Sequence, residues 1–429
     1  MITLGVFLLL AVLMFGGMPI GFAMLASGYV GFSLFVGWEP GLHMVGQTVH
    51  VSTTSYTLSV LPLFILMGNF VARSRLADDL FAAADAFVGH RRGGLAHATV
   101  LACGGFAAVC GSSAATAATM VKVALPAMRA RNYADALSLG SIAAGGTLGI
   151  LIPPSAILLL YGIATETSVP LLFAAGILPG IVAIVLLAAT ILIWVAMKPE
   201  LGPAGPRVGW KARRQSLAGV WGVVMLFLLI MGGILGGVFT ASEGGGIGAF
   251  GALLFALWRR AISWAELLEV LVETAVTSAM IFAIVFGAFV FSNFVVVSGV
   301  PGQLGEFVRS LNVSPLSVML VIIVIYALLG VVLEEVSMML MTLPIFFPIV
   351  TGLGFDPIWF GVVLVVVVEL GMITPPIGIN LFVIQALVPG VTMRTLLIAT
   401  TPFSVALLIL LVLLVFFPQM ALVIPRALG

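Results

Sequence analysis

The stretch LGILIPPS at residues 148–155 returns as LGMITPPI at residues 370–377, which is 222 positions later (148 to 370). Another Leu-Pro pair precedes each copy, beginning at Leu125 and at Leu343, 218 positions apart (125 to 343). The two separations differ by only four residues (222 against 218), which argues against a chance recurrence of prolines in an apolar chain. The sequence therefore predicts two repeats, each with an apolar segment ending near Leu-Pro and then a helix interrupted at Pro-Pro.

Composition indicates that lipid surrounds most of this chain. Of its 429 residues, 62% are apolar and 8% are charged, too few charges for a soluble domain of this size. Apolar runs that could cross a membrane recur at residues 171–197, 217–238, 278–300 and 396–417. About ten to twelve crossings fit, at about 20 residues each. Backbone groups inside lipid must bond within their own segment, so we expect an all-α polytopic membrane protein.

Several other classes of protein and site are disfavoured. A net charge of +1 gives no attraction for nucleic acid. Residues 1–38 lack the basic start of a secretory signal and are interpreted as two mature membrane segments hinged near Pro19. Cys103 and Cys110 lie in an apolar, small-residue segment, so they are interpreted as core cysteines rather than as a disulfide or zinc site.

Charged residues indicate how the repeats are related. The positive-inside rule places the cation-bearing loops 73–92, 129–131, 198–214 and 259–260 in the cytoplasm, and the cation-free connections 38–55, 164–169 and 240–246 outside. Residues 73–92 hold four arginines, whereas the window 222 positions later holds only Arg309. Conversely, Arg394 lies beyond the second broken helix, whereas the corresponding position in the first copy is Leu172, which carries no charge. The repeats are therefore predicted to be inverted across the membrane, as in transporters whose site lies near the midplane.

The expected organisation has six parts. Residues 73–92 have apolar side chains at helical spacing and are predicted to form an interfacial arm, and residues 263–274 resemble a second one. The parts are N-terminal scaffold helices (1–60), a first repeat (61–197) with a re-entrant hairpin (94–128) and a broken helix (134–162), a cytoplasmic linker (198–216), central scaffold helices and an arm (217–273), a second repeat (274–418) with a hairpin (315–353) and a broken helix (357–388), and a C-terminal tail (419–429).

Each Pro-Pro pair is predicted to free backbone oxygens. Proline has no N–H, so Pro153 and Pro154 leave the carbonyls of Gly149 and Ile150 without helical partners, and the second pair acts in the same way beginning at Gly371. An unpaired carbonyl at membrane depth persists only where it lines protein, water or an ion. Such oxygens suit a hard monovalent cation, so sodium is expected at the two breaks.

Small and polar residues mark the tips of the two hairpins. The run GSSAATAAT at residues 111–119 interrupts an apolar stretch whose arms are 95–109 and 121–127, and its first five residues are the predicted tip. The second hairpin turns between Gly330 and Glu335. Hydroxyls in membrane helices also bond to their own backbone, and small residues also serve close packing, so a purely structural role for these residues stays open.

Isolated charges within apolar segments are a further signal. Glu334, Glu335 and Glu369 are carboxylates in surroundings where charge is costly, which is typical of an ion or substrate pathway. Lys122 could pair with a carboxylate, draw an anionic substrate inward, or extend to the cytoplasmic interface. Glu243 fits the first turn of a helix, where an acid stabilises the N-terminus.

Five motifs together resemble the large permease subunit of TRAP transporters, the DctM-like family, in its unfused form. They are GSSAAT (111–116), NYADALSLGSIAAGGTLGILIPPSAILLLYG (132–162), AAGILPGI (174–181), FTASEGGGIGA (239–249) and ELGMITPPIGINLF (369–382). The similarity preserves motif order from about residue 61 to residue 403.

The resemblance implies an elevator-type transporter with two re-entrant hairpins and two broken helices in the bacterial cytoplasmic membrane, and no enzymatic activity. Such a protein takes up an organic acid, often a C4-dicarboxylate or sialic acid, and a sodium gradient drives it. Its partners would be a small four-helix membrane subunit and a periplasmic substrate-binding protein.

Carried over residue by residue, the family's sites fall on three sets of positions. Cys110, which stands where the family commonly has a serine, falls in the set of the first sodium site. The first sodium site takes in Cys110, Ser112, Gly149, Ile152 and Pro154; the second takes in Gly330, Leu333, Gly371, Thr374 and Pro376; the substrate site takes in Ser113, Thr116, Glu334, Ser337 and Asn380.

Two other classes remain as alternatives. A self-sufficient sodium- or proton-coupled symporter for an anion or dicarboxylate would use the same inverted plan without a binding protein. An intramembrane enzyme or scaffold is disfavoured because no Ser-His pair, metal-ligand cluster or phosphate loop occurs at usable spacing.

Overall fold

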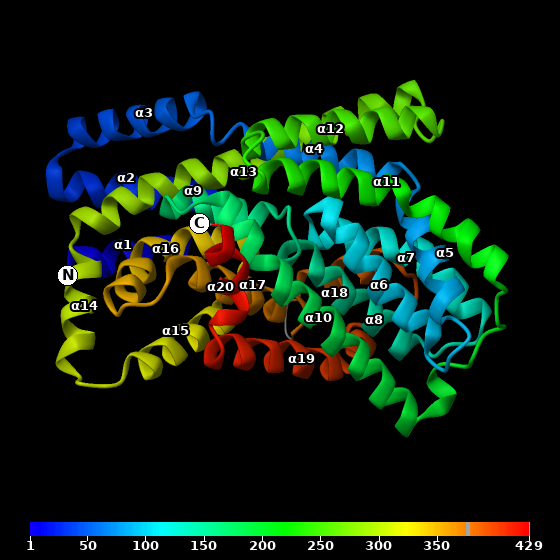
Figure 1. Cartoon of the computed structure of the whole chain (residues 1–429). Helices are drawn as coiled ribbons and strands as arrows, with labels where there is room; N and C mark the ends of the chain where they lie inside the picture. Colours follow the sequence, from blue (N-terminus) through cyan, green and yellow to red (C-terminus); the bar gives the residue numbers. More distant parts are fainter. Residues whose placement is uncertain (375–377, 429) are drawn as a thin grey trace.

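A computed structural model describes residues 1–374 and 378–428 of the chain (Figure 1). These residues form helices joined by short turns, with no β-strand among them. The all-α class predicted from the composition is therefore confirmed.

Glycine and proline divide the N-terminal region into α1 (Ile2–Phe15), α2 (Ile20–Val36) and α3 (Trp38–Thr54). Pro19 directly precedes α2. Proline is tolerated at the start of a helix because the first N–H groups have no partner within the helix. Gly37 has a φ of 115° between α2 and α3, in the left-handed region that favours glycine. The chain therefore breaks at the predicted hinge and again eighteen residues later (19 to 37).

The two halves of the chain contain the same succession of helices. The first half has α4 (Val60–Arg73), α5 (Leu76–Val88), α6 (Gly94–Cys110), α7 (Ser113–Ala130), α8 (Asp135–Leu151), α9 (Ala156–Thr165) and α10 (Val169–Met197). The second has α13 (Trp264–Val297), α14 (Val300–Ser310), α15 (Pro315–Gly330), α16 (Glu335–Gly352), α17 (Pro357–Ile373), α18 (Ile379–Leu387) and α19 (Met393–Phe416). In each half a helix and a shorter arm precede a helical pair, a helix in two pieces, and a long final helix.

One predicted boundary is wrong, because α13 continues through Thr274 without a break. Ser263 and Glu266 form a capping box that starts this helix. No glycine or proline follows until Gly287, so nothing interrupts the helix there. Residues 263–274 are therefore the first turns of a 34-residue helix and not a separate arm.

The linker and the tail contain more helix than the sequence predicts. Between α10 and α11 (Trp210–Leu235) the chain has only the short 3₁₀ turn η1 (Pro199–Leu201) and an extended stretch, so the end of the predicted linker is already helical. α12 (Ala241–Trp258) follows α11, and the predicted tail forms α20 (Gln419–Leu428), which buries Leu422.

The broken helices of the two halves lie side by side at the centre of the molecule (Figure 1). Every residue of α8 from Leu137 to Leu151 is buried, and α17 is almost wholly buried from Trp359 onward. A helix that is apolar on all sides belongs inside a protein. α6, α7, α17 and α19 all pack on α8, so helices from both repeats build one core.

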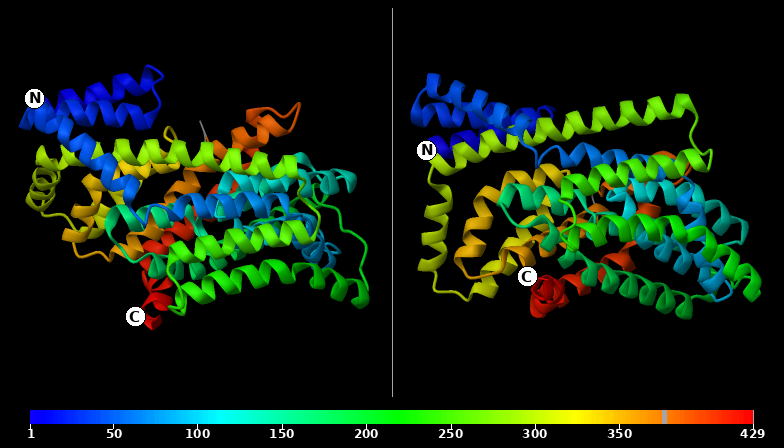
Figure 2. Two further views of the ribbon diagram at one scale, coloured as in Figure 1. Left: turned by 90° about the horizontal axis from the view of Figure 1, so that it is seen from above. Right: turned by 45° about the horizontal axis from the view of Figure 1, so that its top comes forward.

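A second group of helices flanks this core, and α13 extends along it (Figure 2). α13 packs on α2, α3 and α4, and reaches the core through α16. Its contact with α2 is close, because a Cβ atom added to Gly28 would lie 2.7 Å from the Cα atom of Phe291. Small residues allow membrane helices to approach in this way. We call α2, α4 and α13 the scaffold, and α6–α9 with α15–α18 the core.

Among the described residues, six helical segments are long and apolar enough to cross a membrane, with α8 and α9 counted together as one, or seven if the bent pair α4 and α5 counts as a further crossing. The count is lower than the ten to twelve predicted from apolar runs. The difference arises because α1, α2, α6, α15, α17 and α20 are apolar but shorter than 18 residues.

Candidate functional site

The tip of the first hairpin, Gly111 and Ser112, lies against the break in the first broken helix. A Cβ atom added to Gly111 would lie 2.8 Å from the carbonyl oxygen of Pro154, and one added to Gly149 would lie 2.6 Å from the carbonyl carbon of Ser112. Gly111 also has a φ of 69°, which favours glycine. Three predicted sodium ligands, Ser112, Gly149 and Pro154, are thus brought together, with backbone against backbone.

The first Pro-Pro break leaves one carbonyl oxygen free rather than two. The Ser155 hydroxyl donates a 2.5 Å hydrogen bond to the Ile150 carbonyl, so the oxygen released by Pro154 is already satisfied. Within the described chain, no group donates to the Gly149 carbonyl. The prediction for Ile150 is therefore wrong, because the neighbouring serine replaces the missing N–H.

The other two predicted ligands of this site lie at its edge. Ile152 directly follows the last residue of α8, and its side chain packs toward Gly104 and Gly180. Cys110 is buried, and its carbonyl oxygen lies against Gly68 of α4.

The second break repeats the first contact. A Cβ atom added to Gly371 would lie 2.8 Å from the carbonyl oxygen of Gly330, which ends α15. Leu333 is buried in the following turn. The Thr374 hydroxyl donates back to the Leu370 carbonyl at 2.5 Å. Pro376 lies outside the described residues. The predicted ligands Gly330 and Gly371 therefore meet as Ser112 and Gly149 do.

A cavity of about 820 Å³ lies between the two hairpin tips and the scaffold. Among the five residues predicted to contact substrate, Glu334 and Ser337 line it, and Cys110 and Ser112 join them from the first tip. Apolar side chains of the scaffold form the opposite wall, including Phe22, Phe64, Met280, Ile281 and Ile284.

The remaining predicted substrate residues are fully buried and do not line this cavity. The Asn380 amide donates to the Ser113 hydroxyl at 2.7 Å and to the Ala143 carbonyl at 3.4 Å. The Thr116 hydroxyl donates to the Ser112 carbonyl at 2.7 Å. Ser113 and Asn380 thus join α7 of the first repeat to α18 of the second. Helical periodicity explains the difference, because only part of a helical turn faces a cavity.

Several residues that line the cavity were not predicted from the sequence. Asn69 of α4 donates a 3.0 Å hydrogen bond to Thr274 of α13, and both Asn69 and Thr277 line the cavity from the scaffold. A single amide within the apolar run FILMGNFV was the available signal, since polar groups in membrane helices often mark functional positions.

Two isolated charges have contrasting positions. Glu369 in α17 is completely buried, and neither carboxylate oxygen has a hydrogen-bond partner among the described residues. It does not line the cavity between the tips. Lys122 is exposed on α7, one turn beyond the cavity-lining Ala118.

Ion pairs fix the loops at the opposite end of the core from the tips. Arg131 donates two hydrogen bonds to Asp85 of α5, at 2.8 and 2.9 Å, and these bonds raise the pKa of the Arg131 guanidinium. Arg129 binds Asp135 in the same bidentate manner, with both bonds at 3.0 Å. Bidentate arginine–carboxylate pairs are geometrically specific, so they hold the loop between α7 and α8 in place.

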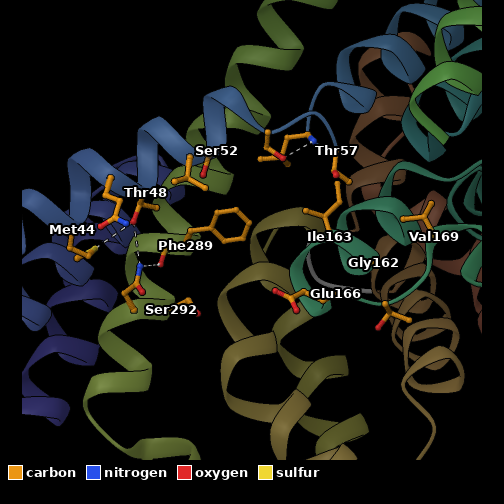
Figure 3. Close-up of a pocket in the computed structure, with 16 residues that line it drawn as sticks. Met44, Thr48, Ser52, Thr57, Gly162, Ile163, Glu166, Val169, Phe289 and Ser292 are labelled. Atoms are coloured by element: carbon orange, nitrogen blue, oxygen red, sulfur yellow. Dashed lines mark hydrogen bonds between the residues drawn. The ribbon is translucent and has the colours of Figure 1, made fainter. Parts of the chain in front are cut away.

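A second cavity, of about 760 Å³, lies between α3, α13 and the turn from α9 to α10 (Figure 3). Its lining combines apolar side chains with the polar side chains of Gln47, Thr48, Ser52, Glu166 and Asn293. Asn293 donates to Thr48 at 3.4 Å across its floor. Both connections predicted on the outer side of the membrane, 38–55 and 164–169, contribute to this cavity.

Comparison with known proteins places the chain in one family. The model of the DctM component of the tripartite ATP-independent periplasmic transporter matches residues 7–420. The chain is 38% identical over 378 residues to the C4-dicarboxylate TRAP transporter large permease protein DctM of Pseudomonas aeruginosa, covering 87% of each chain. It is 34% identical over 449 residues to the protein of the same name in Rhodobacter capsulatus, covering 100% of each.

Solved structures share the fold at lower identity. The YdaH transporter of Alcanivorax borkumensis aligns with a TM-score of 0.61 and 15% identity over 89% of each chain. MtrF of Neisseria gonorrhoeae aligns with a TM-score of 0.57 and 16% identity, over 88% of this chain and 84% of that one.

These relatives agree with the apolar helices in indicating a multi-pass protein of the bacterial inner membrane that transports and does not catalyse a reaction. The family match covers nearly the whole chain and includes both breaks and both hairpins. The chain therefore belongs to the DctM family, the large permease subunits of tripartite ATP-independent periplasmic transporters.

Proposed function

We propose that this chain carries an organic acid into the cell together with sodium, by movement of the core against the scaffold. The observation that carries this proposal is the paired contact of each hairpin tip with a helix break, at Ser112 with Gly149 and at Gly330 with Gly371. The two relatives named for C4-dicarboxylates support the class of substrate.

The first tip offers sodium a set of oxygens. The Gly149 carbonyl has no donor within the described chain, and the Ser112 hydroxyl accepts only a long 3.4 Å bond from the Ala115 N–H. The Pro154 carbonyl lies beside Gly111. Backbone and hydroxyl oxygens of this kind replace water around a monovalent cation. Sodium would thereby join the hairpin to the broken helix.

Coupling follows from the same contact. Without sodium, no ion bridges the Gly149 carbonyl and the tip of the first hairpin, so the tip is less ordered. A tip fixed by sodium presents Ser112 to the cavity, and the second tip presents Glu334 and Ser337. Sodium and substrate would then stabilise one arrangement together, and each would raise the affinity for the other.

The moving unit would be the core defined above. Its broken helices and tips pack backbone to backbone, and at the cavity they face a mostly apolar wall that α2, α4 and α13 of the scaffold form. The cavity leaves space between the two bodies there, which favours movement of one body past the other. Asn69 bonds within the scaffold, to Thr274, and not across this boundary.

We expect two partners, a small membrane subunit and a periplasmic substrate-binding protein, as in the tripartite family. The test is uptake of labelled organic acids into proteoliposomes that contain the chain and its small subunit, with and without the cognate binding protein. Sodium-driven uptake that needs both partners supports the proposal. Accumulation without a sodium gradient would refute sodium coupling, and uptake by the chain alone would favour a self-sufficient symporter.

A further inference from the structure

A glycine-rich turn joins the arm α5 to the first hairpin. It reads GHRRGG at residues 89–94, and Gly93 has a φ of 68°, in the left-handed region that favours glycine. When one body moves against another, a few residues at the ends of helices absorb the change in backbone angles. Residues 89–94 are placed to do this, so we call them the first hinge.

Helices outside the core hold the arm on one side of this hinge. Asp79 of α5 forms an ion pair with Arg259 of α12. The Arg213 guanidinium of α11 donates a 3.0 Å hydrogen bond to the Ala86 carbonyl near the end of α5. α12 packs along α4 of the scaffold, and α11 packs on both α5 and α12. The arm is therefore attached to the scaffold side of the molecule.

One ion pair crosses the first hinge from the arm to the core. Asp85 of α5 accepts two hydrogen bonds from Arg131, which directly follows α7, at 2.8 and 2.9 Å. The two side chains are 23% and 33% exposed. The linker packs over them, because a Cβ atom added to Gly205 would lie 2.9 Å from a terminal nitrogen of Arg131. A bidentate pair restricts distance and angle together, so this pair, which we call the clasp, fixes the angle of the hinge.

The second repeat has no such clasp. α5 ends at Val88 and α14 ends at Ser310, which is 222 positions later (88 to 310). By the same spacing, Asp85 corresponds to Phe307 and Arg131 to Leu353, so both charges are replaced by apolar side chains. A cavity of about 270 Å³ lies between α14 and the end of α16. Among the described residues, no ion pair joins α14 to another element.

This difference between the repeats favours one direction of opening. The cavity between the tips reaches Glu273, whose carboxylate lies 3.7 Å from Arg73 in a loop predicted to be cytoplasmic. Within the described part of the chain, the predicted outer connections 38–55, 164–169 and 240–246 contribute no residue to this cavity. The clasp is therefore formed in a state whose cavity extends toward the cytoplasm. A contact present at one hinge alone stabilises one end state without a counterpart in the other.

We propose that the Asp85–Arg131 clasp holds the core in its cytoplasm-facing position and opens when the core moves outward. Loss of either charge would then raise the share of molecules whose cavity faces outward. This inference rests on the movement of the core in the proposed function, and it does not depend on which acid or ion is carried.

The test measures from which side of the membrane the cavity is open. Ala118 of α7 lines the cavity and is not a predicted ion or substrate residue, so Ala118→Cys supplies a reporter thiol. A membrane-impermeant methanethiosulfonate is added to inside-out and right-side-out vesicles that contain the chain and its small subunit. The chain without Ala118→Cys gives the background from Cys103 and Cys110. With the clasp intact, the reporter should react faster from the cytoplasmic side.

Variants of the clasp should change this sidedness. Asp85→Asn and Arg131→Gln should each raise the ratio of outer to cytoplasmic reaction rates about threefold to tenfold, as for charge-assisted hydrogen bonds in a partly exposed pair. The two changes together should shift the ratio no further than either alone. Asp85→Arg combined with Arg131→Asp should return the ratio toward its original value, which a merely unfolded variant would not do.

The chain offers a matched control in the bidentate pair Arg129–Asp135. Both of these residues belong to the turn between α7 and α8 and would move together with the core. Asp135→Asn therefore removes a similar ion pair without releasing the first hinge, and it should leave the ratio unchanged.

Three outcomes overturn the inference. They are a faster reaction from the outer side with the clasp intact, an unchanged ratio in both Asp85→Asn and Arg131→Gln, and an equal rise in Asp135→Asn. Each would leave the proposed function standing if uptake is still driven by sodium. Absence of sodium-driven uptake for every acid tested, with the ratio shifted as expected, would instead reject the proposed function and retain the clasp.

Discussion

Replacing Gly149 by alanine tests the contact between the first tip and the first break. The added methyl group would lie 2.6 Å from the carbonyl carbon of Ser112 and 2.8 Å from the backbone nitrogen of Ser113, whereas ordinary contacts begin at 3.4 Å. The carbonyl oxygen of Ser112 would lie nearer still, so the tip must move by at least about 0.8 Å (2.6 to 3.4 Å for the carbonyl carbon). Backbone atoms cannot rotate away as a flexible side chain can, so the displacement falls on the tip itself.

This displacement exceeds the tolerance of an ion site, but its expected cost to the stability of the fold is modest. Metal–ligand distances are maintained to about 0.2 Å, whereas overpacking of a core costs about 1–3 kcal/mol. We expect Gly149→Ala to remain folded and to raise the sodium concentration for half-maximal uptake at least tenfold, which corresponds to about 1.4 kcal/mol. The assay is uptake into proteoliposomes over a range of sodium concentrations, with thermal unfolding measured on the same preparation.

Two further variants serve as a control and as a comparison at the second break. Gly232→Ala is the control, because a Cβ atom there meets nothing within 4 Å, and its sodium dependence should equal that of the wild-type chain. Gly371→Ala displaces the Gly330 carbonyl by a smaller distance, from 2.8 to 3.4 Å, and should show a smaller shift. Unchanged sodium dependence in Gly149→Ala would falsify the view that this contact holds the ion.

Three other predictions concern the same core. Asn380→Ala leaves Ser113 and the Ala143 carbonyl without a buried partner, so thermal unfolding should show a loss of about 1–3 kcal/mol; a loss below 0.5 kcal/mol would contradict this. Ser112→Ala removes a helix cap and a proposed ligand, so it should destabilise the chain by about 1 kcal/mol and also weaken sodium dependence; the idea fails if only stability changes. Removal of sodium should accelerate hydrogen exchange at residues 111–118 and 330–337 and leave α13 unchanged, and equal exchange in both conditions would count against ordering of the tips by sodium.

The main breaks of the chain were predictable because proline and glycine act locally. The predicted hairpin at 94–128 contains the turn between α6 and α7, and the predicted broken helix at 357–388 contains the end of α17 and the start of α18. The absence of a helical N–H at Pro153 is a property of that residue alone. The all-α class followed in the same way from the composition.

Which side chains face the cavity could not be predicted from the sequence. Ser112 and Ser113 are adjacent and chemically identical, yet Ser112 lines the cavity and Ser113 bonds to Asn380. The pairing of Ser155 with the Ile150 carbonyl also depends on the three-dimensional path of the break. Long-range packing determines such contacts, and the order of residue types along the chain does not reveal that packing.

The hydrogen bond between Ser113 and Asn380 has a consequence for biogenesis. The two residues are 267 positions apart, and ribosomes add about 5–20 residues per second, so Ser113 is synthesised roughly 13 to 53 seconds before its partner. During that interval the first hairpin is present without the helix that completes it. Insertion factors or lipids must tolerate this unfinished half, and separately expressed halves should each be proteolysed until they meet.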